Sequence, residues 1–170
     1  MNQSQKKVAI GAGSGVVTMI VLLHVFYFFL PTIHGVMSLP ERLAFTLQMN
    51  LFALIPFFVM IIFIGNGRFL SDAIDPTKHL ESNAMEINGR VADNTLQQTF
   101  VFLVGTLALT RSLDTESMKL IVALTIVFII ARVVFWIGYR IDPLYRAPGM
   151  AATSYMNLGI IIYSIVQFIG

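Results

Sequence analysis

The chain has 170 residues, of which 56% are hydrophobic and 12% charged, with a formal net charge of +2 and no cysteine. This composition is too apolar for a soluble domain, so a lipid bilayer must surround much of the surface. The small charge, without a basic stripe interleaved with aromatics, argues against nucleic-acid binding. The lack of cysteine excludes disulfides, a cysteine nucleophile and thiolate metal sites.

The first predicted element is an apolar run from Val8 to Leu30, preceded by Lys6 and Lys7. As a helix it is about 35 Å long, enough to cross the hydrocarbon core. It is too long for a signal peptide and no small-x-small cleavage site follows, so a retained transmembrane helix is expected. Gly11 and Gly15 have the spacing of a helix-packing surface, and no strand precedes them to support a nucleotide-binding loop.

Four more apolar spans follow. The second contains Pro56, which membrane helices tolerate with a kink. In the polar loop after it, His79 and Glu81 lack the spacing of a helical metal-binding pair, so no metal is expected. The predicted spans are 43–64, a third that starts within 86–98 and ends at Thr110, 118–138 and 150–168.

Basic residues are distributed unequally between the two sides of these spans. The N-terminus, the 65–93 loop and the 139–149 turn carry seven Lys or Arg, and the opposite side carries three. The positive-inside rule therefore predicts that the N-terminus and both of these loops are cytoplasmic. The Arg90 and Arg146 regions then share one membrane face.

The start of the third span is polar. Arg90, Asn94, Gln97 and Gln98 fall at i, i+4, i+7 and i+8, which places them on one helix face. A guanidinium and three carboxamides on one face predict a binding surface for a polar, anionic ligand.

Arg132 lies inside the fourth span, where an unpaired arginine costs at least about 2.5 to 3.5 kcal/mol. It should therefore face the bundle interior. Phe135 or Trp136, then Tyr139, follow on the same face, and Arg146 comes just past the helix end. This face is expected to line a pocket near the cytoplasmic interface.

A simpler alternative is open at this point. Arg132 could pair with Asn94 or Asp93 only to hold helices together, and the basic turn could meet only lipid headgroups.

Two stretches resemble one known family. Arg90-xxx-Asn94-xx-Gln97 is similar to the Arg-xxx-Asn-xx-Glu signature of the MAPEG superfamily, membrane-associated proteins of eicosanoid and glutathione metabolism. The run ARVVFWIGYRIDPLYRAPG, residues 131–149, resembles that family's third-helix signature and the arginine-rich turn after it. The resemblance covers about 43–170 and leaves the first helix outside.

The resemblance implies an all-α integral membrane fold. This would be a MAPEG-like four-helix transmembrane bundle at 43–170, with one extra N-terminal transmembrane helix and link at 1–42. It further implies a homotrimer that binds glutathione, as a co-substrate, between subunits near the cytoplasmic face.

Individual site residues carry over from the same resemblance. Arg90, Asn94 and Gln97 match positions that hold the backbone and carboxylates of glutathione. Tyr139 matches an aromatic that borders the site, and Arg146 matches the arginine that stabilises the glutathione thiolate. Arg132 joins this set from its place on the face shared with Tyr139.

Three positions depart from the family pattern. Gln97 replaces the usual Glu, and Gln98 and Phe135 stand where some catalytic members have tyrosine hydroxyls. Two functions are therefore expected. The first is a membrane-bound glutathione transferase or peroxidase acting on a lipophilic electrophile from the bilayer. The second is a non-catalytic lipid-binding or scaffold protein on the same fold. A channel or transporter is less well supported, since neither an inverted repeat nor a ring of carboxylates is visible.

Overall fold

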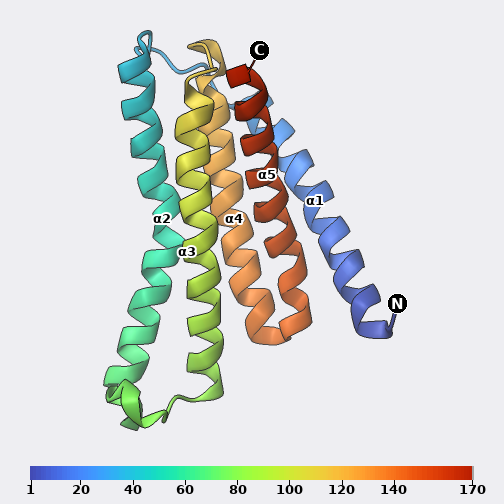
Figure 1. The fold of residues 1–170 in the computed structure, drawn as a ribbon, viewed down its shortest axis with the longest axis vertical. Helices are drawn as coiled ribbons and strands as arrows, with labels where there is room; N and C mark the ends of the chain where they lie inside the picture. The colour runs from blue at the N-terminus through green and yellow to red at the C-terminus, as the bar shows by residue number, and fades with distance from the viewer. Residues whose placement is uncertain (170) are drawn as a thin grey trace.

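Five long helices form the molecule, and the computed structural model describes residues 1–169, within which no strand occurs. Short 3₁₀ turns lie in the loops that follow α2, α3 and α4. The helices are arranged as an elongated bundle (Figure 1). They are α1 (Gln3–Phe29), α2 (Leu39–Phe69), α3 (Asn83–Thr110), α4 (Lys119–Ile141) and α5 (Ala147–Ile169).

The helix starts follow from capping chemistry. Asn2 and Ser38 each form a capping box, with Gln5 and Glu41 respectively, and the Ser82 side chain accepts a hydrogen bond from the amide of Met85. These caps place the starts of α1 and α2 a few residues before the apolar runs begin, and they start α3 at Asn83, well before its apolar run at Phe100. The observed helices are therefore longer than the predicted spans.

Successive helices run in opposite directions (Figure 1). The N-terminus, the α2–α3 loop and the α4–α5 turn lie at one end of the bundle. The α1–α2 link and the α3–α4 turn lie at the other end, as does the end of α5. The expectation that the Arg90 and Arg146 regions share one end is confirmed, while its assignment to the cytoplasm stays a prediction.

Four helical stretches are long and apolar enough to cross a membrane, so the chain is a multi-pass integral membrane protein. They are 3–29, 39–69, 116–141 and 143–169. The expectation of five such spans is not met, because α3 falls outside this set. The first helix is one of the four rather than a span in addition to them.

The low hydropathy of α3 comes mainly from the charged and amide side chains of its first half, residues 83–98, and its second half carries polar groups that are paired inside the bundle. Its inward side chains include Thr106 and Thr110, which hydrogen-bond to Asn50 at 3.1 Å and Thr46 at 2.7 Å on α2. In a bundle, such polar groups are paired with neighbouring helices instead of meeting lipid. A hydropathy average lowers its value for every polar side chain and takes no account of the hydrogen bonds that such a side chain makes in the bundle.

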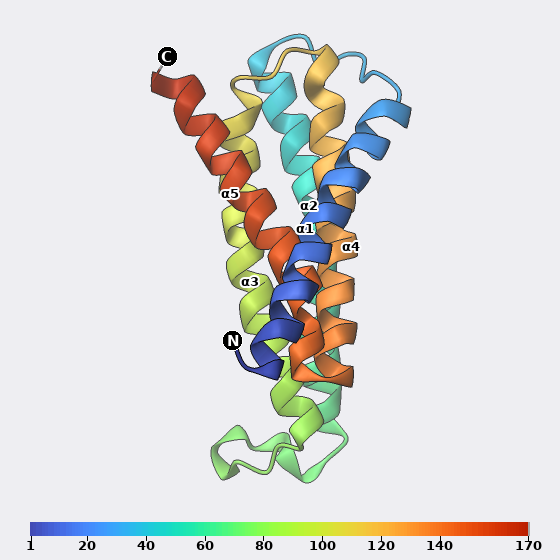
Figure 2. The ribbon, with the colours of Figure 1, turned by 90° about the vertical axis from the view of Figure 1, so that its right-hand side faces the viewer.

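The first helix crosses the start of α5 at a glycine (Figure 2). Gly15 is buried, and a Cβ there would overlap the backbone of Pro148, while a Cβ at Gly11 would lie 3.2 Å from that of Ala147. The predicted role of Gly11 and Gly15 in close helix packing is confirmed.

Candidate functional site

The guanidinium of Arg132 joins three helices in the bundle interior. Its side chain is fully buried on α4. Nη1 donates to Oγ1 of Thr153 on α5, and Nη2 donates to Oδ1 of Asn94 on α3, each at 3.0 Å. Both partners are neutral, and within residues 1–169 no carboxylate forms an ion pair with Arg132. Of the two partners considered from the sequence, Asn94 forms the contact, and Asp93 is exposed.

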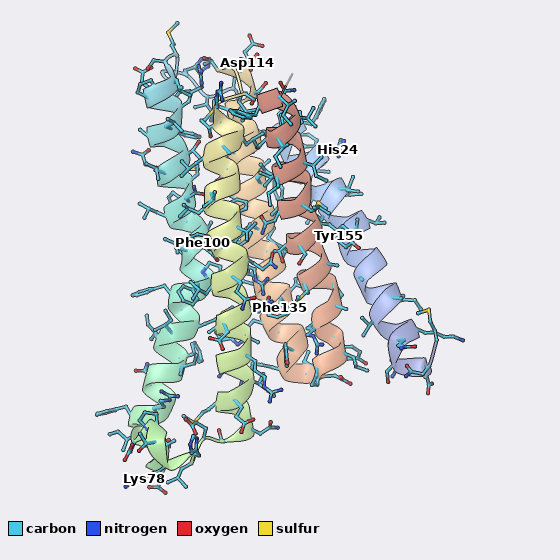
Figure 3. The ribbon with its side chains drawn as sticks, viewed as in Figure 1. His24, Lys78, Phe100, Asp114, Phe135 and Tyr155 are labelled. Atoms are coloured by element: carbon cyan, nitrogen blue, oxygen red, sulfur yellow. The ribbon has the colours of Figure 1, made fainter. Side chains whose placement is uncertain are left out.

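Two aromatic rings lie between two arginines in a row that runs from Arg132 to the α4–α5 turn. The Arg132 guanidinium lies 4.1 Å from the ring centroid of Phe135, which stacks edge-on to Tyr139 at 5.8 Å. The guanidinium of Arg146 then lies 5.2 Å from the Tyr139 ring. Such contacts stabilise a desolvated cation by about 1 to 2 kcal/mol. The predicted shared face of these residues is confirmed, with Phe135 as the aromatic. Figure 3 shows Phe135 in the bundle interior.

Arg146 is half-buried in the turn after α4. Its Nη1 donates to the carbonyl of Pro143 at 2.8 Å. A Cβ at Gly138 would overlap the carbonyl of Tyr145, which shows that the backbone of the turn lies close to α4. Since this bond uses one of five guanidinium N–H groups, Arg146 keeps donors for a ligand.

The polar face at the start of α3 divides into two edges. Arg90 is exposed and lies 3.9 Å from Glu86, and Gln97 is also exposed. At about 100° per residue, Asn94 and Gln98 lie about 40° and 80° around the helix from Arg90, whereas Gln97 is within about 20° of it. Arg90 and Gln97 therefore face away from the bundle, while Asn94 and Gln98 face α4 and α5. The single four-residue surface expected from the spacing does not form within one chain.

Gln98 pairs with the fifth helix. Its Nε2 donates to Oγ of Ser154 at 3.2 Å, and Nδ2 of Asn157 donates to its Oε1 at 3.0 Å. Thr153, Ser154 and Asn157 were not identified from the sequence. The signal that could have found them is their polarity within an otherwise apolar span, with two of them spaced i, i+4.

Other charged groups at this end lie outside the network. Arg68 forms an ion pair with Glu81 at 3.2 Å. The hydroxyl of Thr77 donates to Asp75, which lowers the pKa of that carboxyl. Among the described residues, no group of three or more His, Asp or Glu is placed to hold a metal ion.

Fold and site together define an all-helical, multi-pass membrane protein with a buried arginine tied to two neighbouring helices. A family model, the MAPEG family, matches residues 16–166, and the chain belongs to this family. The match begins within α1 and not near Leu43, so the expectation that the first helix lies wholly outside the family region was wrong.

One curated relative adds to this. The chain is similar to transmembrane protein 79 from Mus musculus, with 23% identity over 145 residues, which is 85% of the chain and 37% of the relative. The chain therefore spans little more than a third of that relative's length. No solved structure matches the chain.

Proposed function

We propose that this protein is a membrane-bound, glutathione-dependent transferase or peroxidase that acts on lipophilic electrophiles. The observation that carries the proposal is the placement of its exposed polar groups. Arg90 faces outward in the part of α3 nearest the α4–α5 turn that holds Arg146, and Gln97 faces outward two helical turns further along α3, while Arg132 and Asn94 brace the helices that hold them. Arg90 makes only an exposed contact with Glu86 at 3.9 Å, and the Gln97 side chain makes no hydrogen bond within residues 1–169, so both remain available to a ligand and to a neighbouring subunit.

Glutathione suits these groups chemically. It carries two carboxylates, which arginine binds through paired hydrogen bonds, and one thiol. A guanidinium near the sulfur favours the thiolate, which is the nucleophilic form. In the transferase reaction the thiolate sulfur bonds to the electrophilic carbon, and either a leaving group departs from that carbon with its bonding electron pair or, for an activated double bond, the π bond breaks and the adjacent carbon takes up a proton from water. Arg146 would hold the thiolate, and Arg90 and Gln97 would hold the peptide.

The proposal includes a homotrimer with glutathione between subunits. Support comes from the exposed side of α3, where Leu96, Phe100 and Val104 are spaced four residues apart and are 49%, 68% and 50% exposed. An apolar strip next to outward polar groups fits a contact between copies of the chain. α2 to α5 would form this unit, and α1, in which the family match begins, would pack on its α4 and α5.

A second candidate is a non-catalytic lipid-binding or scaffold protein on the same fold. It is favoured by the roles of Gln98 and Phe135, since Gln98 is engaged with Ser154 and Asn157, and Phe135 packs under Arg132. Neither side chain supplies a catalytic hydroxyl, and Gln97 cannot supply a negative charge for an amino group.

The test uses purified protein in detergent. The expected results are glutathione-dependent thermal stabilisation and consumption of a model electrophile, both strongly reduced in Arg146→Ala. Arg140→Ala is the matched control, because it removes one exposed positive charge at the same end of the bundle. Binding without turnover would favour the second candidate. Absence of both binding and turnover would overturn the proposal.

A further inference from the structure

A cavity of about 520 Å³ lies between α1 and α5, at the end of the bundle away from Arg146. The two helices cross near Gly15 and Pro148 and diverge toward the other end, which opens a wedge (Figure 2). Side chains from the end of α3 and the first half of α4, such as Leu109 and Leu124, also line the cavity. Its volume falls in the range of small-molecule sites.

The lining is apolar with a few uncharged polar groups. Leucine, methionine and isoleucine side chains supply most of the surface, and no Asp, Glu, Lys or Arg contributes to it. The polar groups come from His24 and Tyr27 on α1, Ser117 before α4, and Tyr155 and Tyr163 on α5. Figure 3 shows His24 and Tyr155 on the two helices that form the wedge.

The hydrogen bonding of His24 leaves an acceptor for a ligand. Its Nδ1 lies 2.8 Å from the carbonyl of Ile20, and a carbonyl can only accept, so Nδ1 carries the proton. In the neutral imidazole, Nε2 is then a bare acceptor. The cavity is also lined by the hydroxyls of Tyr27, Tyr155 and Tyr163. They make no hydrogen bond within residues 1–169, so each can donate to a ligand or accept from it.

The positive charge of Lys119, close to the cavity, is already in contact with an aromatic ring. The Lys119 ammonium lies 4.6 Å from the Tyr27 ring centroid and is not part of the lining. A charged headgroup inside the cavity would lose water without gaining an opposite charge. An uncharged ligand avoids this cost.

We propose that this cavity binds one uncharged lipid whose polar group is a hydroxyl on a ring system, as in a sterol. The rings would pack against the aromatic faces of Tyr27, Tyr155 and Tyr163, and the hydroxyl would donate to Nε2 of His24. The site is separate from the proposed glutathione site, and its occupancy does not depend on glutathione.

The first test fills the cavity. Gly159 lines it, and a Cβ there meets no atom within 4 Å, so Gly159→Leu adds bulk without backbone overlap. Gly13→Leu is the matched control, since a Cβ at Gly13 also meets nothing and Gly13 is not part of the lining. Saturation binding of a radiolabelled sterol to the purified protein should be lost in Gly159→Leu and kept in Gly13→Leu. Equal binding by both variants would overturn the proposal.

The second test asks whether the hydroxyl is recognised. Wild type should bind the sterol roughly three- to tenfold more tightly than the same ring system without its hydroxyl, the value of one net hydrogen bond. His24→Phe keeps an aromatic ring but removes the acceptor, so it should bind both compounds equally. Preference for an anionic phospholipid over the sterol, or an unchanged sterol preference in His24→Phe, would contradict the assignment.

Discussion

Asn94 on α3 accepts a hydrogen bond from the guanidinium of Arg132 on α4, at 3.0 Å and in the interior of the bundle. The arginine lacks a carboxylate partner within residues 1–169, so its charge depends on neutral oxygens and on the face of Phe135. Removing one of these oxygens leaves a buried donor unsatisfied, which costs more than the bond itself contributes.

Asn94→Leu should therefore lower the free energy of unfolding by about 1 to 3 kcal/mol. Arg132→Leu together with Asn94→Leu should recover part of that loss, because the buried charge is gone as well. Thermal unfolding of the two single variants and the double variant in one detergent measures the coupling. Gln97→Leu, at an exposed position of the same helix, is the control. Strictly additive losses would show that the two side chains are not coupled.

Gly15→Leu should weaken the attachment of the first helix. A Cβ at this position overlaps the carbonyl of Pro148, so α1 must move away from the start of α5. Overpacking of this kind costs about 1 to 3 kcal/mol. Thermal unfolding and protease cleavage of the α1–α2 link would report the change. Gly13→Leu should behave as wild type, and equal effects at both glycines would contradict the proposed contact.

The two ends of the bundle should be reachable from opposite sides of the membrane. Lys78 and Asp114 lie at opposite ends (Figure 3), and the chain has no cysteine. Single variants Lys78→Cys and Asp114→Cys can therefore be tested with an impermeant thiol reagent in intact cells. The positive-inside rule predicts labelling of Asp114→Cys only. Labelling of Lys78→Cys alone would reverse the predicted orientation.

Asp114 should make the α3–α4 turn sensitive to acid. The hydroxyl of Ser117, and then its backbone N–H, hold the pKa of the Asp114 carboxyl below its ordinary value. A lowered folded-state pKa contributes stability that is present above the unfolded-state pKa of about 3.9. That contribution is lost as the pH falls through the lower, folded-state value. The unfolding temperature of wild type should therefore fall in this window, and part of the fall should be absent in Asp114→Asn.

Gln97→Glu tests the proposed glutathione site through an expected gain of affinity instead of a loss. The new carboxylate would face outward beside Arg90 and supply an anionic partner for the amino group of glutathione. For an exposed ion pair the gain is about 0.2 to 1 kcal/mol, so the affinity should rise by less than tenfold. Titration calorimetry with Gln97→Asn as the neutral control measures it. Unchanged binding by Gln97→Glu would argue that this position does not contact the ligand.

The sequence by itself determined the helical architecture and which loops share an end of the bundle. Apolar runs of membrane-spanning length located four candidate spans and the stretch that became α3, and the basic loops grouped two regions that do lie at one end. The helical repeat also placed Arg132, either Phe135 or Trp136, and Tyr139 on one face, with Arg146 just past the helix end. These inferences succeed because they depend on local periodicity and on the cost of a charge in lipid.

Only the tertiary structure decided which partners meet. Arg132 takes Asn94, 38 positions earlier, and Thr153, 21 positions later, and nothing local distinguishes these from other polar residues. The sequence likewise does not reveal that Gln98 faces α5 and Gln97 faces outward, because this depends on which side of α3 packs against α5. The wedge between α1 and α5 likewise follows from where Gly15 meets Pro148. Such contacts depend on how whole helices cross, and a spacing within one helix cannot specify that.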